Sequence, residues 1–441
     1  MDQQPTRVDA SPKQAGAMYG KHPWVEPRVW TERMLEALHN GVKGDVWFSL
    51  IDKVWSPRTL LAAWEHVRAN GGSGGVDRQT VEQFEIGLEQ RLATLSDELR
   101  TGRYRPRPVR RTYIPKADGR LRPLGIPTVR DRIVQGAVRL VIEPIYETAF
   151  SEHSYGFRPG RGAKDALRRV DGLLRGGGRY VVDADLKSYF DTIPHERLMA
   201  AVRTRVADGR VLGVIEMFLK AGIMEDLREH RPTAGTPQGG VISPLLANIY
   251  LHPLDRIMAE EGYEMVRYAD DFVVICNSAE RAHAALARIR AWVSAAGLEL
   301  HPEKTRLVDM DQSGGFDFLG YHFEQGRKTP REKSLKKLKD TIRAWTRRTN
   351  GYSMMYITAR LSRVLRGWFG YFKHSHRYTF ERIDRFVRTR LRSVYRKRAK
   401  RKGRGRGMDH VRWPNRHFYD GLRLFSLERA YQLALQSRRA H

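Results

Sequence analysis

Residues 265–277 read MVRYADDFVVICN, and the adjacent carboxylates of Asp270 and Asp271 constrain the fold of this chain more than any other feature. They lie between two runs of apolar, β-branched and aromatic residues, which are typical of buried strands. Because consecutive residues of a strand point to opposite faces, both carboxylates can serve one site only where the chain turns. The sequence therefore predicts a hairpin with Ala269, Asp270 and Asp271 at its tip.

Two adjacent carboxylates in apolar surroundings repel each other and lose hydration, so a cation must compensate them or their pKa must rise. Mg²⁺ suits such a pair, because it uses one or two carboxylates and keeps positions for water and phosphate. A third carboxylate would let two ions hold the attacking and leaving oxygens of a phosphoryl transfer. The stretch VVDADLKSYFD offers Asp183, Asp185 and Asp191, and the residues alone leave that choice open. Taken by itself, an aspartate pair in a turn is more often a solvated turn than a metal site.

Hydrophobic periodicity predicts an α+β fold, in which a small sheet is backed by helices. Besides the two arms of the hairpin, strands are expected at 179–186 and 316–323, and a strand pair is expected around the turn Asp118-Gly119. Ser243, followed by Pro244, marks the start of a long helix. The expected helices of this part lie at about 130–147, 195–206, 211–223, 243–262 and 281–297.

The net charge of +29 is concentrated in the last quarter of the chain. Residues 327–441 hold 34 of the 79 Lys and Arg residues but only 7 of the 50 Asp and Glu residues, a net charge of +27. A nearly neutral body with a basic C-terminal region indicates a globular unit that holds a polyanion, most commonly nucleic acid. The alternative is a solvated tail, but a disordered tail would lack the apolar periodicity seen here. Three helices are expected, at about 332–348, 354–374 and 379–400.

Several classes of protein are excluded by composition. No stretch approaches the roughly 20 uninterrupted apolar residues of a membrane span, and the polar start lacks the apolar core of a secretory signal. The single cysteine, Cys276, excludes an intramolecular disulfide and a Cys-rich zinc module. These features indicate an intracellular protein with two or three domains and no membrane partner.

The motifs around the hairpin resemble, in order along the chain, those of the group II intron-encoded reverse transcriptase and maturase family. The matching stretches are YRPRPVRRTYIPKADGRLRPLGIPTVRDRIVQ, SYGFRPGRGAKDAL, VVDADLKSYFDTI, GTPQGGVISPLLANIYLHPLD, RYADD, LHPEKT and FDFLGYHF. The resemblance covers about 46–400 and, more weakly, the end of the chain. It implies a right-hand polymerase of fingers, palm and thumb, with a palm sheet backed by helices, a three-helix thumb and a basic C-terminal region.

The same resemblance implies a division of the chain into four parts. Residues 1–45 would form an N-terminal extension and 46–325 the fingers and palm. Residues 326–400 would form the thumb, or maturase (X) domain, and 401–441 a basic DNA-binding region. The chain is similar to the short bacterial class C intron proteins, which lack the zinc-dependent endonuclease module of longer members.

Carried over to this sequence, the family pattern selects Asp185 as the partner of Asp270 and Asp271, and these three would bind two Mg²⁺ ions. Asp183 would then be structural. The pattern marks Phe190 as a steric gate, whose ring lies where a ribose 2′-hydroxyl would project. Without the family, Phe190 would be interpreted as a core residue.

The family also implies contacts to an incoming dNTP. Lys116, Arg122 and Arg110 lie on the expected finger hairpin, where Arg and Lys would bind the triphosphate. Gln238 corresponds to a glutamine against the nucleotide sugar and template base, and Lys304 to a residue that protonates the pyrophosphate leaving group. Without the motif order, the basic residues would be interpreted as exposed side chains on a turn or at a helix end.

Nucleic acid is expected to bind basic residues of the SYGFRPGRG stretch, the thumb and the C-terminal region. The candidates are Arg158, Arg161, Lys336, Lys337, Arg366, Arg396, Lys397 and Arg398.

The resemblance implies an RNA-directed DNA polymerase with maturase activity, which binds group II intron RNA, assists its splicing and copies it into DNA at a target DNA. Its substrates would be dNTPs on an RNA template with a DNA primer. One alternative is a domesticated relative that serves DNA repair, phage defence or a CRISPR system. A second is a non-catalytic splicing cofactor, which the complete set of three aspartates disfavours. The expected location is the bacterial-type cytoplasm, in the nucleoid or a ribonucleoprotein, and monomer and homodimer both stay open.

Overall fold

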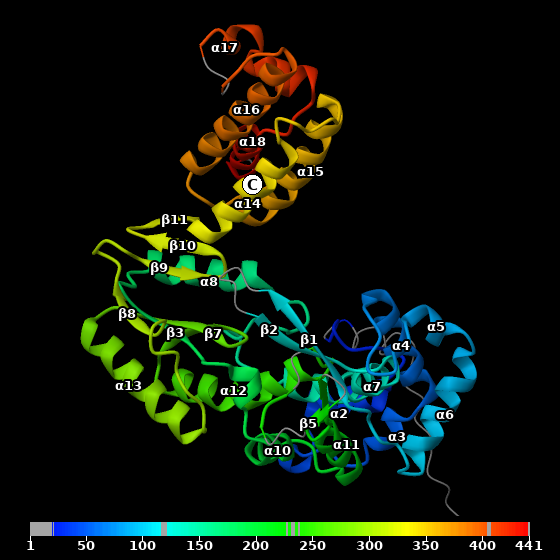
Figure 1. Cartoon of the computed structure of the whole chain (residues 1–441). Coiled ribbons are helices and arrows are strands. Elements are labelled where there is room, and N and C mark those ends of the chain that lie inside the picture. The colour runs from blue at the N-terminus through cyan, green and yellow to red at the C-terminus, as the bar shows by residue number, and fades with distance from the viewer. Residues whose placement is uncertain are drawn as a thin grey trace, which may run out of the picture. The chain divides into compact units, whose positions relative to one another are not determined.

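The computed structural model describes residues 20, 22–115, 121–225, 228–230, 234–236, 239–403 and 407–439. They form the expected mixture of helices and strands, shown in Figure 1. The chain divides into two compact units. Unit 1 comprises Met1–Arg169, Val182–Val274 and Glu280–Arg306, and unit 2 comprises Val170–Val181, Ile275–Ala279 and Leu307–His441. None of the described helices has the length and apolar character needed to cross a membrane.

Each helix predicted before the C-terminal quarter is present to within a few residues, and this part of the chain contains further helices. Their ends follow local signals, such as Thr128, whose side chain accepts a hydrogen bond from Asp131 N at the start of α7. In chain order they are α2 (Glu32–Asn40), η1 (Lys43–Asp45), α3 (Ile51–Val54), α4 (Pro57–Asn70), α5 (Val81–Glu85), α6 (Leu88–Arg100), α7 (Val129–Glu147), α8 (Ala163–Arg175), α9 (Tyr189–Thr192), α10 (His195–Arg203), α11 (Gly209–Leu219), α12 (Ser243–Glu260) and α13 (Ala279–Ala295).

The described part of the N-terminal extension is folded into unit 1. Trp30 is fully buried, and its indole N–H donates to the Leu140 carbonyl at 3.0 Å. Leu35 and Leu38 of α2 are buried as well. From residue 22 onward this segment therefore contributes to the core.

The predicted strand pair around Asp118-Gly119 is present, although its turn lies outside the described residues. Strand β1 (Val109–Pro115) pairs antiparallel with β2 (Leu121–Ile126), with Pro115 opposite Leu121. Strands β4 (Ile223–Glu225) and β5 (Arg228–His230), which were not predicted, extend the sheet in the order β2-β1-β4-β5. They form because α11 ends at Leu219, earlier than expected, and Gly222 then accepts a hydrogen bond from Val109 N at 2.7 Å.

A second four-stranded sheet contains the predicted hairpin. Its order is β6-β7-β3-β8, with β6 (Glu264–Tyr268), β7 (Asp271–Cys276), β3 (Tyr180–Asp185) and β8 (Arg306–Asp309). The turn consists of Ala269 and Asp270, whereas Asp271 is already the first residue of β7. Helices α12 and α13 lie along one face of this sheet (Figure 1). The hairpin prediction is thus confirmed, with the turn one residue shorter than expected.

The prediction of one strand over 316–323 was wrong. Strands β9 (Phe316–Phe318) and β10 (Tyr321–Glu324) pair antiparallel, and β11 (Arg327–Pro330) pairs with β10 on its other side. Leu319 and Gly320 separate the strands and have φ angles of +47° and +84°. Two successive residues in the left-handed region reverse the chain, and glycine adopts this conformation without a steric penalty.

The three helices predicted for the basic region are confirmed as α14 (Glu332–Trp345), α15 (Met354–Phe372) and α16 (Tyr378–Arg398). Their buried faces meet in one core, which includes Ile342, Leu361 and Val387. After them come α17 (Asp409–Arg412), η2 (His417–Gly421) and α18 (Leu427–Arg439). Asp384 of α16 accepts hydrogen bonds from the backbone N–H groups of residues 427 and 428, at 3.1 and 3.2 Å, and so caps α18. The end of the chain is therefore part of unit 2.

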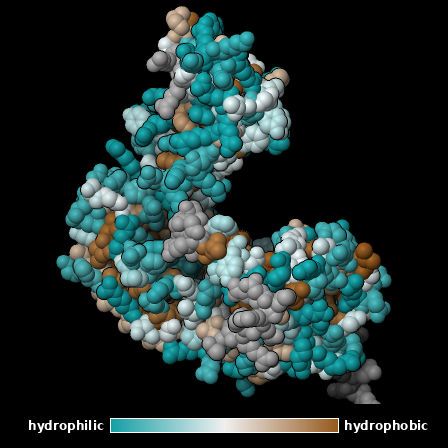
Figure 2. All heavy atoms as spheres, in the orientation of Figure 1, coloured by the Kyte–Doolittle hydropathy of each residue, from teal (hydrophilic) through white to brown (hydrophobic). Residues whose placement is uncertain are grey.

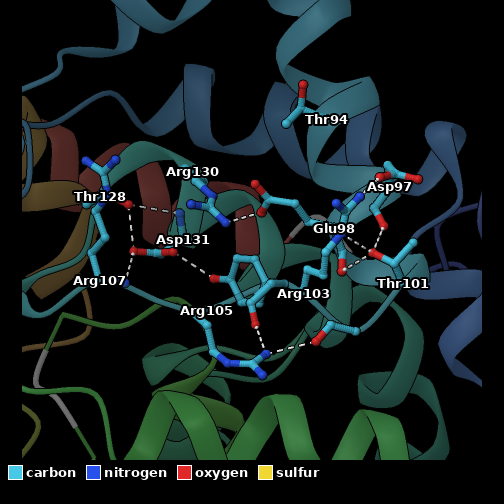
Figure 3. Close-up of polar contacts among 12 residues, drawn as sticks. Thr94, Asp97, Glu98, Thr101, Arg103, Arg105, Arg107, Thr128, Arg130 and Asp131 are labelled. Atoms are coloured by element: carbon cyan, nitrogen blue, oxygen red, sulfur yellow. Dashed lines mark hydrogen bonds and ion pairs between the residues drawn. The ribbon is translucent and has the colours of Figure 1, made fainter.

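A buried carboxylate joins α7 to the segment before β1. In Figure 3 the Asp131 carboxylate lies between Thr128 and Arg107. It accepts the Tyr104 hydroxyl at 2.7 Å, the Thr128 hydroxyl at 2.6 Å and the Arg107 backbone N–H at 3.1 Å. Asp131 is only 1% exposed, and this burial raises the pKa of its carboxyl above the ordinary 3.8.

This raised pKa predicts a pH-dependent stability. The neutral form of Asp131 is favoured in the folded chain, so its stabilising contribution is complete below about pH 3.8 and is lost as the pH rises through the higher pKa of the folded state. We expect the melting temperature of the wild type to fall relative to that of Asp131→Asn as the pH rises from about 4 towards neutrality. Asp97→Asn is the control, because its hydrogen bond with Arg100 lowers the pKa of Asp97 and moves its titration below this window. Parallel curves for wild type and Asp131→Asn would contradict the prediction.

Candidate active site

The sheet places Asp185 and the turn that contains Asp270 on neighbouring strands. Asp185 is the last residue of β3. On the neighbouring strand, Asp271 is the first residue of β7 and Asp270 lies in the turn before it. The charge of Asp185 is among the groups that raise the pKa of Asp270, so these two carboxylates interact. Asp183 lies two residues back on β3, where its carboxylate accepts Arg306 Nε at 3.2 Å.

Burial is the main cause that raises the pKa of Asp270, and the negative charge of Asp185 adds to it. The backbone N–H of Asp270 and the positive charges of Arg122 and Lys304 act in the opposite direction. The net pKa stays above 3.8, so the protein's own cations do not fully compensate this carboxylate. A cation bound at this carboxylate would lower its pKa.

The donor set suits Mg²⁺, because carboxylate oxygens are the hard ligands that this ion prefers. Among the described residues, however, no group of three His, Cys, Asp or Glu side chains is arranged closely enough to hold a metal ion. The Asp185 carboxylate instead forms an ion pair with the Lys304 ammonium. The carboxylate ligands thus suit Mg²⁺. In this structure the Lys304 ammonium pairs with one of these carboxylates, that of Asp185.

Backbone pairing places Lys304 beside Asp185. The His301 N–H donates to the Asp185 carbonyl at 2.8 Å, and the Lys187 N–H donates to the Glu299 carbonyl at 2.8 Å. Leu186 forms an isolated antiparallel bridge with Leu300. The LHPEKT stretch is thereby fixed along the end of β3, with the Lys304 side chain about half exposed.

Phe190 lies close to this end of β3, on the short helix α9. Tyr189 beside it is buried and donates its hydroxyl to the Ala247 carbonyl at 2.6 Å, which fixes the helix. The Phe190 ring is partly exposed and meets the ring of Phe157 edge to face, with centroids 6.3 Å apart. The Phe190 carbonyl accepts the Thr236 N–H at 2.7 Å, so the GTPQGG stretch begins directly beside it.

Phe157 was not predicted as a site residue. It is 46% exposed, and its φ angle of +60° is unusual for a bulky side chain. Strained backbone of this kind is concentrated at functional sites. The only signal in the sequence is its place in the SYGFRPGRG stretch.

The finger hairpin presents Arg122 as an exposed residue of β2. Arg110 is differently engaged, because its guanidinium donates to the Gly74 carbonyl at 2.8 Å and to the Ser73 hydroxyl at 3.2 Å. Lys116 and Gln238 lie outside the described residues. After the latter position comes Gly239, with a φ of +115°, where an added Cβ would lie 2.6 Å from the Gly125 carbonyl oxygen. The backbones of β2 and the GTPQGG stretch thus approach as closely as glycine allows.

Arg158 does not belong to the nucleic-acid-binding surface on which it was predicted. Its side chain is 2% exposed and pairs with Glu147 at 2.7 Å. It also donates to the carbonyls of Ser151 and Ser154. The guanidinium is therefore occupied in the interior of unit 1.

The other predicted nucleic-acid contacts fall into two groups. Arg161 donates to the Glu152 carbonyl at 2.6 Å, and Arg396 is mostly buried in an ion pair with Asp409 at 2.8 Å. The remaining five are exposed on unit 2, namely Lys336, Lys337, Arg366, Lys397 and Arg398.

Two family models match this chain. Residues 114–323 match the model described as "Reverse transcriptase (RNA-dependent DNA polymerase)", and residues 335–413 match "Group II intron, maturase-specific domain". The first match contains the three aspartates, and the second begins within α14 and ends just after α17.

Curated relatives agree with these models. Protein YkfC of Escherichia coli (strain K12) is 37% identical over 292 residues, which span 57% of this chain and 76% of that protein. The group II intron-encoded protein LtrA of Lactococcus lactis subsp. cremoris is 40% identical over 207 residues, which span 46% of this chain and 34% of LtrA. A solved structure of a partial Cas6-RT-Cas1–Cas2 complex is 23% identical with a TM-score of 0.36, over 56% of this chain and 42% of that one.

Proposed function

This chain belongs to the family of reverse transcriptases that carry a group II intron maturase-specific domain, and from this premise we propose that it copies RNA into DNA at the site around Asp185, Asp270 and Asp271. The observation that carries the proposal is the meeting of Asp185 with the Asp270 turn on adjacent strands, within reach of the charges of Arg122 and Lys304. We propose a DNA primer on an RNA template, with dNTPs, as its substrates.

The three aspartates would hold two Mg²⁺ ions, which supply activation of the primer 3′-hydroxyl and stabilisation of charge on the transferring phosphate. Arg122 is exposed on the finger hairpin and suits the triphosphate, because guanidinium groups bind phosphate oxygens in pairs. Lys304 now pairs with Asp185, and its ammonium would be released as the aspartates take up cations. A released Lys304 can then donate a proton to the departing pyrophosphate.

Extension of a DNA primer on an RNA template in Mg²⁺ tests this proposal. We expect the wild type to incorporate dNTPs and to lose this activity when the metal is chelated. A chain that binds primer and template but incorporates no nucleotide would contradict it.

We further propose that unit 2 binds group II intron RNA and assists its splicing. Five of its basic residues, Lys336, Lys337, Arg366, Lys397 and Arg398, are exposed on its helices, and the visible face of the molecule is mainly hydrophilic (Figure 2). RNA is bound largely through phosphates and shape, so such faces suit it, and the affinity should fall steeply with salt. Addition of the protein to an intron RNA at low Mg²⁺ should speed splicing. Primer extension without any effect on splicing would favour the domesticated relative.

An aromatic patch gives unit 2 a second means of holding RNA. It comprises Trp345, Tyr352, Tyr356 and Arg360. The two tyrosine rings lie 4.8 Å apart and are 55% and 38% exposed, and the Arg360 guanidinium lies 5.2 Å from the Tyr356 ring. From residue 346 to 366 the sequence contains no acidic residue. Exposed aromatic rings beside arginine suit stacking with unpaired bases.

Replacement of both tyrosines tests this patch. Tyr352→Leu with Tyr356→Leu should weaken binding of structured intron RNA about tenfold, because stacking is worth roughly 1–3 kcal/mol per base. Tyr378→Leu is the matched control, since Tyr378 is 52% exposed and also lies beside an arginine, Arg377. Filter binding at fixed salt measures the effect. Equal affinities of the double variant and the control would contradict the assignment.

A further inference from the structure

Arg267 is a charged residue with no solvent access, two positions before the Ala269-Asp270 turn. Its side chain is 0% exposed, and the Asp255 side chain opposite it, from α12, is 4% exposed. Arg267 Nε and Nη2 donate to the two Asp255 oxygens at 2.7 and 2.5 Å. This bidentate pair compensates both charges in the interior.

The third guanidinium nitrogen is directed at the turn. Arg267 Nη1 donates to the Ala269 carbonyl at 2.9 Å and to Asn248 Oδ1 at 2.9 Å. Ala269 has a φ angle of +61°, which is costly for alanine, and its carbonyl belongs to the peptide bond that leads into Asp270. The guanidinium therefore holds the peptide group that sets the direction of the Asp270 backbone.

A second segment fixes the same turn through its backbone. The Arg267 N–H donates to the His153 carbonyl, and the Tyr155 N–H donates to the Arg267 carbonyl, both at 2.9 Å. Asn248 Nδ2 donates to the Gly156 carbonyl at 2.8 Å. An added Cβ on Gly156 would lie 2.3 Å from Ala269 N, so only glycine allows this segment to lie against the turn.

We propose that Arg267 is a positioning residue for the polymerase reaction. With Asp255 and Asn248 it forms a buried hydrogen-bonded cluster. This cluster fixes the Ala269 carbonyl and thereby the placement of Asp270 and Asp271. This inference rests on the proposed function. A buried ion pair contributes little net stability compared with apolar residues of similar size. A displacement of about 1 Å in a reacting group, by contrast, can cost on the order of a hundredfold in rate. Removal of this buried cluster should therefore affect the rate of dNTP incorporation more than the free energy of unfolding.

Two variants separate positioning from stability. Arg267→Met with Asp255→Leu replaces the ion pair by apolar side chains, and Arg267→Lys keeps the charge but loses the planar fork that reaches Ala269. For each we expect the single-turnover rate constant of dNTP incorporation to fall about a hundredfold. The KM for dNTP should change less than threefold, and the melting temperature should stay close to that of the wild type. The single-turnover rate constant does not depend on the fraction of molecules that are folded.

The control is Arg130→Met with Glu98→Leu, which removes a partly buried ion pair between α7 and α6 in the same unit (Figure 3). It should keep the wild-type rate constant. If either Arg267 variant is folded and incorporates dNTP within threefold of the wild-type rate, the inference is overturned. If the double variant does not fold, the single-turnover rate constant of Arg267→Lys alone tests the inference. Failure of the wild type to incorporate any dNTP would refute the proposed function instead, so the two failures are distinguishable.

Discussion

Asp270→Asn is expected to lower dNTP incorporation on a primed RNA template by on the order of a thousandfold or more. The change keeps the size of the side chain but removes the charge with which Asp270 is proposed to hold a cation. Asp270 is partly buried and its carboxylate interacts with the charge of Asp185. Binding of RNA should stay within a few fold, because the exposed basic residues of unit 2 are unchanged. Single-turnover primer extension and filter binding measure the two quantities.

Asp183→Asn is the matched control for this variant. Asp183 lies on the same strand as Asp185 but pairs with Arg306, so its loss should leave incorporation within a few fold of the wild type. Comparable losses in both variants would mean that the charge of the region, rather than the position of Asp270, supports the reaction. Retained synthesis by Asp270→Asn would overturn the metal assignment.

Phe190→Ala is expected to admit ribonucleotides, with discrimination between dNTP and rNTP falling by on the order of tenfold to a hundredfold. The ring of Phe190 meets the rings of Tyr189 and Phe157 edge to face. In the proposed gate role of Phe190, removal of the ring would open the space for a 2′-hydroxyl. The ratio of kcat/KM for the two nucleotides measures this effect, while kcat for dNTP should change much less.

Phe48→Ala serves as the control, because Phe48 is an exposed phenylalanine of the same unit that has no place in the site. Unchanged discrimination in Phe190→Ala would refute the gate assignment and return Phe190 to the role of a packing residue.

The parts of the fold that depend on local pattern were predictable. The apolar runs on both sides of Asp270 and Asp271 specified the hairpin, because buried arms and a polar turn leave few other arrangements. Periodicity placed α14, α15 and α16, since an apolar stripe at helical spacing requires a partner surface. The prediction of one strand over 316–323 was wrong because Leu319 has a left-handed backbone conformation, which leucine rarely adopts.

Residues that depend on distant partners were not predictable in the same way. Arg158 was predicted as a nucleic-acid contact and Arg267 was assigned no role, yet each is buried against a carboxylate from another element. Arg110 reads as a phosphate contact, whereas its donors reach the glycine-rich loop at Ser73 and Gly74. A side chain's partner is set by tertiary packing, so sequence pattern gives its chemistry but not its direction.

The chemistry of the site was more accessible than its geometry. The pair Asp270 and Asp271 predicted a cation site, and the family resemblance implied Asp185 as its third carboxylate. Burial raises the pKa of Asp270 in the structure. The ion pair of Lys304 with Asp185 required the pairing of residues 299–301 with the end of β3, which no local pattern contains.

The proposed RNA-directed DNA synthesis can be measured by extension of a DNA primer on an RNA template by the wild-type chain, with Mg²⁺ and with the metal chelated. We expect DNA synthesis that requires both the RNA template and the divalent ion, with Asp183→Asn active and Asp270→Asn inactive in the same assay. Wild-type chain that binds the primed template in Mg²⁺ and yet adds no nucleotide would contradict it.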